Sequence, residues 1–264
     1  MPEGPEVKIA SDYYNSFFKD SVNFNFNMLT EYYEQKYHSI FHTLRTYHPT
    51  SFSACFTVGK NLFIPLNKNR LFNFHLGMTG GWSHQNEKHC HFRVSSSSGD
   101  LFFKDVRKFG KMRILSTDEF DLKHIPQFDL LNERYDFEAH LSFLSKKISS
   151  KKSICSTLMN QTYFPGVGNY IKSEALYATK IHPEKKWGQL SKRSIKRLIL
   201  NTKEIMQTSY RTGGAELNDF KNPFNQSRFS LKVYGKSIDL QGNQVVSQLT
   251  SDQRKSWFCP KIQK

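Results

Sequence analysis

The run LMNQTYFPGVGNYIKSEAL, residues 158–176, contains two helical patterns separated by the turn-forming stretch FPGVG. Apolar residues recur at three- and four-residue spacing on both sides of this stretch, which predicts two helices joined by turns. Asn169 follows the last glycine and begins the second helix. Glycines let a backbone approach a phosphate closely, and helix N-terminal amides with an Asn side chain can hold one. Simple capping of the helix by Asn169 is the alternative.

Helical periodicity extends outward from this run over residues 135–210. Four segments carry it: FEAHLSFL, SICSTLMNQ, GNYIKSEALYATK and LSKRSIKRLILNTKEIMQ. Residues 211–230 lack periodicity and contain a Gly pair, which predicts a mobile loop. The tail, residues 231–264, contains the strand-like run LKVYG, followed by VVSQL and KSWF. The last two predict a hairpin with Arg254 at or beside its turn.

The N-terminal half has a different pattern. Residues 5–18 predict a helix, in which Pro5 takes a first-turn position that sacrifices no hydrogen bond. From about residue 22 to residue 116, short runs rich in Phe, Tyr, Thr and Val predict strands. These runs are FSACFTV, NLFIPL, HFRVS, LFFKD and MRIL, with SSSSGD as a turn between two of them. This half is therefore expected to form an antiparallel sandwich or barrel.

An acidic, loop-like stretch at residues 117–134 predicts a hinge between two domains. The expected fold class is α+β. An N-terminal antiparallel β-sandwich with a leading helix precedes a helical helix–two-turns–helix domain that ends in a β-hairpin. The expected boundaries are 1–128 for the sandwich domain, 129–230 for the helical domain with its loop, and 231–264 for the hairpin.

The composition is that of a basic globular protein. The 264 residues are 38% hydrophobic and 14% aromatic, which is enough for packed cores. The formal net charge is +15 and the pI is about 9.6, which favours a polyanionic partner. Nucleic acid is the commonest such partner inside cells, and an anionic membrane surface is the alternative.

The sequence also excludes some locations. We expect no signal peptide, because MPEGPEVKIA contains charges and two prolines where an apolar core would be needed. No apolar run reaches the ~20 residues of a membrane span, so no membrane partner is expected. Four scattered cysteines without a C-x-x-C motif suit a reducing compartment. The expected location is therefore intracellular.

The start of the chain, MPEGPEV, carries distinctive chemistry. Proline at position 2 permits removal of the initiator Met, which would leave Pro2 with a free secondary amine. Such an amine adds to a sugar anomeric carbon, and the resulting iminium is an electron sink that promotes elimination of a phosphate. Glu3 could protonate the ring oxygen as a general acid, and Glu6 lies at a helix start that favours a carboxylate. The alternative is that PEGPE only caps a helix.

Several motifs in a fixed order together resemble one family. MPEGPEV, HLGMTG at 75–80, DVRKFG at 105–110 and the run at 158–176 are similar to motifs of the formamidopyrimidine-DNA glycosylase / endonuclease VIII (Fpg/Nei) family. GGAELNDF, VYGK and QRKSWFCP follow in the family's order, so the resemblance spans essentially the whole chain. It implies a DNA glycosylase of base excision repair that is also a lyase acting through a Schiff base.

The resemblance implies roles for individual residues. The expected catalytic residues are Pro2 as nucleophile, Glu3 as acid, Lys60, Glu6 and Glu174. The expected contacts to DNA phosphates come from His75, Gly168, Asn169, Tyr234 and Arg254. Met78, Arg107 and Phe109 are expected to fill the gap left by a flipped-out nucleotide.

Some of these residues also have ordinary structural interpretations. On their own, Met78 and Phe109 would be interpreted as core residues. Lys60 would be a strand lysine, and Glu174 would be a solvated residue on a helix.

The tail departs from the zinc finger with four cysteines in which this family usually ends. Beyond residue 155 the only cysteine is Cys259, and the last histidine is His182. A tetrahedral zinc site needs four ligands, so residues 231–264 are predicted to bind no metal, and no cofactor is expected. The chain therefore resembles the Nei-like 1 branch with its zincless finger, whose hairpin arginine corresponds to Arg254. The cluster His89-Cys90-His91 is expected in a strand or loop.

These expectations combine into one function and two rivals. The chain, as a monomer, is expected to excise oxidised pyrimidines, formamidopyrimidines and hydantoins from double-stranded DNA and to cut the strand by β,δ-elimination. Single-stranded and bubble DNA are alternative substrates. A silent lesion-binding protein and a basic RNA-binding or scaffolding protein are the rival functions. The abundance of Asn, Lys, Phe, Tyr and Ile indicates an AT-rich genome, with a giant virus as one hypothesis and a nuclear, cytoplasmic or viral-factory location.

Overall fold

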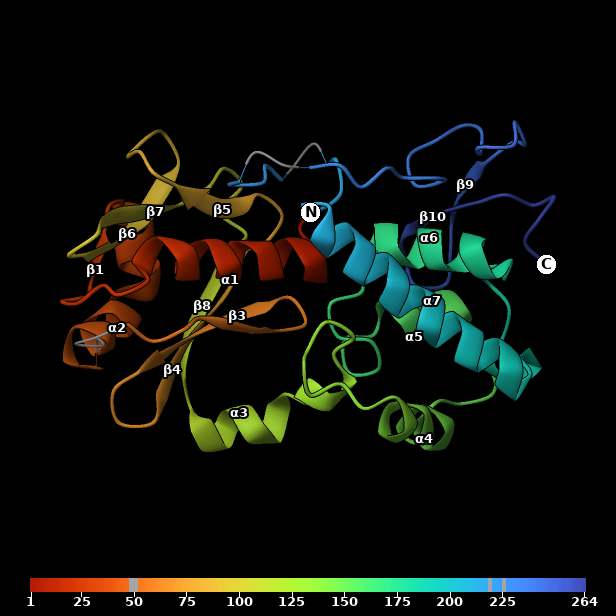
Figure 1. Cartoon of the computed structure of the whole chain (residues 1–264), viewed down its shortest axis with the longest axis horizontal. Helices are drawn as coiled ribbons and strands as arrows, with labels where there is room; N and C mark the ends of the chain where they lie inside the picture. Colours follow the sequence, from red (N-terminus) through yellow and green to blue (C-terminus); the bar gives the residue numbers. More distant parts are fainter. Residues whose placement is uncertain (48–51, 218–219, 225–226) are drawn as a thin grey trace. The chain divides into compact units, whose positions relative to one another are not determined.

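The computed structural model describes residues 1–47, 52–217, 220–224 and 227–264. The chain divides into two compact units (Figure 1). The first has helices and antiparallel sheets, and the second is mainly helical with a terminal hairpin, so the predicted α+β class is confirmed. The first unit comprises Met1–Pro2, Glu6–His124 and Leu217–Ser227, and the second comprises Glu3–Pro5, Ile125–Glu216 and Arg228–Lys264.

The first unit contains two four-stranded antiparallel sheets, with strand orders β1-β6-β7-β5 and β2-β3-β4-β8. Four of the predicted strand runs are confirmed, and of the fifth, FSACFTV, only Phe56–Val58 forms a strand. The serine-rich segment makes the turn between β6 and β7 as expected. The strands are β1 (Asn25–Met28), β2 (Phe56–Val58), β3 (Asn61–Leu66), β4 (Arg70–His75), β5 (Gly80–Ser83), β6 (Cys90–Ser96), β7 (Gly99–Asp105) and β8 (Lys111–Ser116). The predicted leading helix is α1 (Gly4–Phe18).

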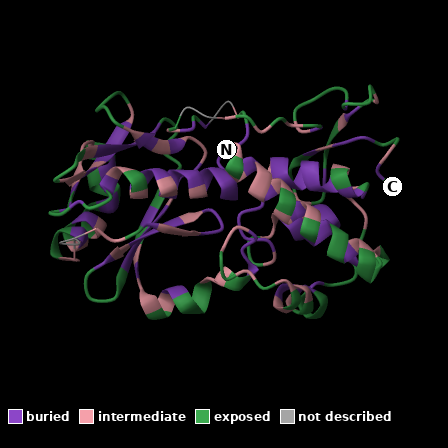
Figure 2. Ribbon diagram, viewed as in Figure 1, coloured by how far each residue is buried: buried purple, intermediate pink, exposed green. Residues whose placement is uncertain are grey.

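Aromatic side chains join the two sheets. The ring centroids of Phe72 and Phe92 are 6.2 Å apart, and those of Phe74 and Phe103 are 5.8 Å apart, and the two rings of each pair pack in an edge-to-face arrangement. All four residues are fully buried. This geometry suits the ring quadrupoles and packs one sheet on the other, so the predicted sandwich is confirmed. Figure 2 shows the buried residues running along these strands.

The helix α2 (Glu31–Tyr47) corrects the prediction for its segment, where only strands were expected. Its Tyr, Phe and Thr content is typical of strands. However, the buried residues Tyr33, Tyr37, Phe41 and Leu44 recur at four- and three-residue spacing, which is the period of a helix. Periodicity therefore outweighs composition here.

The helix α3 (Thr117–Lys123) corrects a second prediction, because this stretch was expected to be loop-like. The Ser116 side chain accepts a hydrogen bond from Glu119 N, and the Glu119 side chain accepts one from Ser116 N. This capping box satisfies two amides at the helix start. A short 3-10 helix, η1 (Pro126–Phe128), follows it.

In the second unit, all four helices predicted between residues 135 and 210 are confirmed. They are α4 (Phe137–Lys147), α5 (Ile154–Met159), α6 (Asn169–Thr179) and α7 (Lys192–Arg211), with a 3-10 helix, η2 (Trp187–Gln189), before the last. The side chains of Asp136, Ser153 and Ser191 cap α4, α5 and α7 respectively. None of the helices in the described ranges combines the length and apolarity that a membrane crossing requires.

The chain ends in the predicted hairpin, made of β9 (Val246–Leu249) and β10 (Lys255–Phe258). Arg254 lies in the connection directly before β10, as expected. The loop prediction for residues 211–230 falls partly outside the described residues. Within the described part, Ala215 pairs with Phe229 in an isolated bridge.

Candidate functional site

The Glu3 carboxylate caps the N-terminus of α6 within the second unit. Its Oε1 accepts a hydrogen bond from Tyr170 N at 2.9 Å, and its Oε2 accepts one from Ile171 N at 3.3 Å. The first amides of a helix lack partners within the helix, and its dipole favours a negative charge there. Glu3, only 3% exposed, is thereby held in one place by a helix that begins 166 residues further along the chain.

Gly168 makes room for this carboxylate. A Cβ at position 168 would lie 2.7 Å from the Glu3 Cγ and closer still to its carboxylate. The backbone at Gly168 has φ −132° and ψ −158°, an extended conformation open to any residue, so the restriction is steric. Gly4 N also donates to Gly166 O at 2.9 Å. The glycines were predicted to approach a phosphate; in the structure they approach the N-terminal segment, and a phosphate contact at Gly168 stays a prediction.

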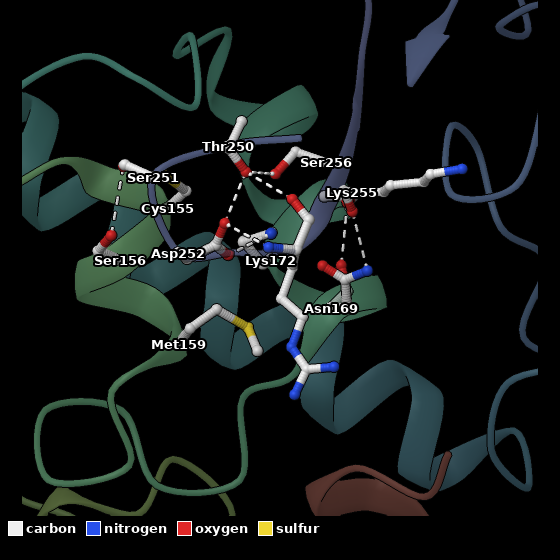
Figure 3. A network of polar contacts seen from close by, with 12 residues as sticks. Cys155, Ser156, Met159, Asn169, Lys172, Thr250, Ser251, Asp252, Lys255 and Ser256 are labelled. Carbon is white, nitrogen blue, oxygen red and sulfur yellow. Dashed lines mark hydrogen bonds and ion pairs between the residues drawn. The ribbon is translucent and has the colours of Figure 1, made fainter. Parts of the chain in front are cut away.

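Asn169 begins α6 as predicted, but it is not the N-cap residue, because Gly168 occupies that position. The Asn169 Nδ2 donates to the carbonyl oxygen of Lys255 in β10 at 3.0 Å (Figure 3). The side chain therefore joins the start of α6 to the terminal hairpin, and the capping alternative is wrong. An amide carries two N–H donors, of which this bond uses one. A phosphate contact at Asn169 stays a prediction.

The Glu174 carboxylate holds the backbone at residues 232–234. Its Oε1 accepts hydrogen bonds from the N–H groups of Lys232, Val233 and Tyr234 at 3.1, 3.0 and 3.0 Å, and its Oε2 accepts a second one from Lys232 at 3.1 Å. Three successive N–H groups that converge on one anion form a nest, so the predicted strand LKVYG is wrong. Glu174 is 2% exposed, and its interpretation as a solvated residue is also wrong.

Tyr234 is positioned by this nest and by two aromatic rings. Its ring centroid lies 4.5 Å from that of Trp257 in β10 and 6.4 Å from that of Tyr170 in α6. The side chain is half-buried. The predicted phosphate contact at Tyr234 and the catalytic role of Glu174 are not tested by these contacts and stay predictions.

In the first unit, Lys60 and His75 lie together at one end of a sheet. Lys60 is in the two-residue turn between β2 and β3, not in a strand, and its neighbour Asn61 pairs with His75. Burial, and then the positive charges of Lys60 and Lys111, lower the pKa of His75 to about 4. The His75 Nδ1 accepts a hydrogen bond from Gly77 N at 2.9 Å, so the neutral ring carries its proton on Nε2. His75 would therefore meet a phosphate as a neutral donor near pH 7.

Asp105 joins the turns of the motifs HLGMTG and DVRKFG by hydrogen bonds. These two motifs carry the side chains that are expected to fill the gap left by a nucleotide. Its Oδ1 accepts a hydrogen bond from the Thr79 hydroxyl at 2.5 Å, and its Oδ2 accepts one from Gly110 N at 2.7 Å. Arg107 N in turn donates to Thr79 Oγ1 at 3.0 Å. Asp105 is fully buried, so these bonds are not exchanged for water. No role for Asp105 or Thr79 was predicted, although both lie inside the quoted motifs.

The predicted gap-filling side chains extend from these turns. Phe109 is 50% exposed, so its interpretation as a core residue is wrong, whereas Met78 is half-buried. The Arg107 guanidinium lies 5.0 Å from the centroid of the Phe109 ring, a cation–π contact. Gly77 has φ +68°, and a Cβ there would lie 2.6 Å from the Phe109 backbone. The two turns are thus in close contact.

Replacing Asp105 with alanine should destabilise the protein by about 2 kcal/mol or more, because it leaves the Gly110 amide and the Thr79 hydroxyl without their acceptor. Urea unfolding measures the change. Asp100→Ala is the matched control, since Asp100 forms a partly exposed ion pair with Arg93. An Asp105→Ala variant within about 0.5 kcal/mol of the natural chain would show that Asp105 does not hold the turns together.

The remaining predicted residues lie as follows. Arg254 is exposed, and its carbonyl oxygen accepts a hydrogen bond from Thr250 N at 3.0 Å. Pro2 follows Met1 and is buried. Glu6 is fully buried in the first turn of α1.

Residues 231–264, which include the terminal hairpin, contain one cysteine, Cys259, and no histidine. Among the described residues, no group of three or more His, Cys, Asp and Glu side chains is placed to hold a metal ion. Cys259 is buried, and its N–H donates to Gln263 Oε1 at 2.8 Å. In the other candidate cluster, both ring nitrogens of His91 contact oxygens, Thr30 Oγ1 at 3.1 Å and Asp105 O at 2.9 Å. Cys90 and His91 lie in β6, as expected.

Comparison with known proteins adds an independent finding. Residues 1–112 match the formamidopyrimidine-DNA glycosylase N-terminal domain, and residues 129–221 match the formamidopyrimidine-DNA glycosylase H2TH domain. Formamidopyrimidine-DNA glycosylase of Novosphingobium aromaticivorans is 30% identical over 211 residues, which cover 76% of this chain and 77% of that protein. The enzyme of the same name from Lactococcus lactis subsp. cremoris is 31% identical over 218 residues, covering 78% of this chain and 79% of that protein.

Two solved structures of DNA complexes have the same fold as this chain over essentially its full length. The complex of wild-type Lactococcus lactis Fpg (MutM) with DNA containing N7-benzyl-Fapy-dG superposes with a TM-score of 0.84 at 26% identity, covering 100% of both chains. The complex of Lactococcus lactis Fpg with abasic-site DNA gives a TM-score of 0.82 at 26% identity, covering 99% of both chains. With the domain matches, the relatives and the shared fold in agreement, the chain belongs to the formamidopyrimidine-DNA glycosylase family.

Proposed function

We propose that this chain is a bifunctional DNA glycosylase and abasic-site lyase that removes oxidised bases in base excision repair, with Pro2 as its nucleophile. Membership of the family supports the activity of a DNA glycosylase on oxidised bases. The placement of Glu3 is the observation that supports the lyase activity and the role of Pro2. Its carboxylate accepts two hydrogen bonds from α6 amides, in a space that exists only because position 168 is a glycine. The residue next to Pro2 is thus built into the helix–two-turns–helix element.

Removal of Met1 comes before the reaction and leaves Pro2 with a secondary amine. The amine attacks the sugar C1′, Glu3 assists ring opening, and the damaged base leaves with the bonding electrons. The adduct becomes an iminium that has no N–H to lose and keeps its positive charge. It acidifies the C2′ hydrogen, so that β-elimination and then δ-elimination release the two phosphates. Water finally hydrolyses the iminium, which frees the Pro2 amine and leaves the sugar remnant as an aldehyde.

DNA recognition is assigned to the residues named above. The residues that contact DNA phosphates are Lys60 and a neutral His75 in the first unit, and Asn169, Tyr234 and Arg254 in the second. The exposed Phe109 and Arg107 enter the duplex with Met78 when the nucleotide is flipped out. A flipped nucleotide loses a few kcal/mol of stacking and pairing, which such side chains offset.

The proposed substrates are formamidopyrimidines, oxidised pyrimidines and hydantoins, in double-stranded DNA and also in single-stranded DNA. The related Lactococcus structures contain Fapy-dG and abasic DNA, which agrees with the first class. The other classes rest on the likeness of the tail to a Nei-like 1 zincless finger. That likeness is supported by the donor set of the hairpin, in which Cys259 is the one thiol and histidine is absent.

Borohydride trapping on duplex DNA that contains an oxidised pyrimidine tests the proposal. The natural chain with verified Met1 removal should form a covalent adduct whose peptide map places the link at Pro2. Pro2→Gly, with processing verified by intact mass, should lose the adduct. Pro5→Ala is the matched control, because it removes a proline from the same segment and keeps the nucleophile.

Three outcomes would reject the proposal. An adduct mapped to a lysine would exclude Pro2 as the nucleophile. Retained Met1 with lesion binding and no excision would favour a silent lesion-binding protein. Equal affinity for undamaged RNA and DNA, without any dependence on Pro2, would favour the RNA-binding or scaffolding function.

A further inference from the structure

The turn that carries Arg254 is fastened to α6 by a buried ion pair. Lys172 Nζ lies 2.6 Å from Asp252 Oδ2, and the two side chains are 0% and 3% exposed. Lys172 is on α6, three residues after Asn169, and Asp252 is in the connection between β9 and β10. Figure 3 shows the two side chains pointing toward each other beside the hairpin.

The other oxygen of Asp252 closes the turn on itself. Asp252 Oδ1 accepts hydrogen bonds from Thr250 Oγ1 at 2.6 Å and from Arg254 N at 3.3 Å. The Thr250 hydroxyl also lies 2.9 Å from the Arg254 carbonyl oxygen and 2.7 Å from Ser256 Oγ. The backbone of Arg254 is therefore bound on both its N–H and its C=O sides, and both bonds lead to Asp252 or to its partner Thr250.

A second set of hydrogen bonds holds Ser251, the residue between Thr250 and Asp252. Ser251 N donates to Glu184 Oε1 at 2.6 Å, and Ser251 Oγ lies 2.6 Å from Ser153 Oγ at the start of α5. Two consecutive residues of one turn are thus bound to different parts of the helical unit, Ser251 to the α5 side and Asp252 to α6. Such a turn has little freedom to move relative to the helices.

A buried ion pair is a costly way to obtain stability alone. Two charges lose their hydration on burial, and apolar residues of similar volume often stabilise a fold equally well. What a buried pair adds is a single geometry, because each partner must meet the other to avoid an unpaired charge. The location of this pair under the Arg254 turn indicates which geometry it selects.

We propose that Lys172 and Asp252 are positioning residues that fix the Arg254 turn for contact with a DNA phosphate. The inference rests on the proposed function, since it requires that Arg254 bind DNA. Neither side chain touches the DNA itself. Their effect on binding passes through Arg254.

A double-mutant cycle separates this role from a purely structural one. The variant Lys172→Met/Asp252→Asn leaves no buried charge unpaired, and thermal melting checks that it folds. Affinity is measured for duplex DNA containing a tetrahydrofuran abasic analogue, over a series of salt concentrations. Arg254→Ala should weaken binding on the order of 10- to 100-fold, the range of a charge-assisted hydrogen bond. The pair variant should lose a similar factor.

The decisive result is the combination. Arg254→Ala introduced into the pair variant should weaken binding by no more than about 2-fold further, because its contribution is already lost. The slope of log affinity against log salt should fall by about 1 in each variant and by no more in the combination. Lys196→Met is the control for loss of one positive charge. Lys196 is half-exposed, and its ion pair with Glu138 is long, at 4.0 Å.

Two results would overturn the inference. One is a folded pair variant that binds within about 2-fold of the natural chain, and the other is an undiminished effect of Arg254→Ala in the pair variant. If the pair variant melts early, Lys172→Arg enters the same cycle, and any loss it causes must vanish when residue 254 is alanine. If Arg254→Ala alone has no effect, the inference fails, whereas trapping at Pro2 still decides the proposed function separately.

Discussion

Replacing Gly168 with alanine should lower the rate of base excision by a factor on the order of 100 to 10,000, the range expected for loss of a general acid. The new Cβ would overlap the Glu3 side chain, with its closest contacts at the carboxylate. The carboxylate would have to leave the amides of Tyr170 and Ile171, and Glu3 would no longer be held in its place next to Pro2, the proposed nucleophile. Single-turnover excision of an oxidised base measures the effect.

The control for this substitution is Gly81→Ala, because a Cβ at position 81 would meet nothing within 4 Å. The cause is tested by combination with Glu3→Ala. If Gly168 acts by placing Glu3, the double variant should be no slower than Glu3→Ala alone. Additive losses, or a Gly168→Ala variant with the natural rate, would contradict the steric argument.

Replacing Glu174 with alanine should destabilise the protein by about 3 kcal/mol or more and strongly reduce DNA cleavage. The substitution leaves the N–H groups of Lys232, Val233 and Tyr234 without their common acceptor. The Val233 bond is buried and the other two are partly buried, and a buried donor left unsatisfied costs about 1–3 kcal/mol. The nest would open and release Tyr234 from its place against Trp257. Urea unfolding and cleavage of abasic-site DNA measure the two effects.

The matched control is Glu204→Ala, which removes an exposed carboxylate from the neighbouring helix α7. It should change the free energy of unfolding by no more than about 0.5 kcal/mol. Glu174→Gln distinguishes two roles, since an amide oxygen can keep the three bonds to Oε1 but carries no charge. Full cleavage activity in Glu174→Gln would mean that Glu174 only positions the nest, and natural stability in Glu174→Ala would contradict the positioning role itself.

Much of the fold could be predicted because local patterns determined it. The helices α4 to α7 and the terminal hairpin follow from periodicity and turn residues over windows of 5 to 20 residues. The failures arose where composition and period disagreed, as in α2, and where a tertiary partner outweighed local propensity, as in the LKVYG segment. The capping box of α3 is visible in the sequence as Ser116 followed three residues later by Glu119.

The sequence by itself determined the helices α1 and α4 to α7, the terminal hairpin, the family and the chemistry available at Pro2 and Glu3, because these depend on residue types at short spacing. The tertiary structure alone decided which polar groups meet. Glu3 binds an amide 167 positions away, Lys172 pairs with an aspartate 80 positions away, and Glu174 holds a backbone 58 positions away. Such pairings have no local pattern, since they arise only when the folded chain excludes water and leaves each buried charge or amide one partner within reach.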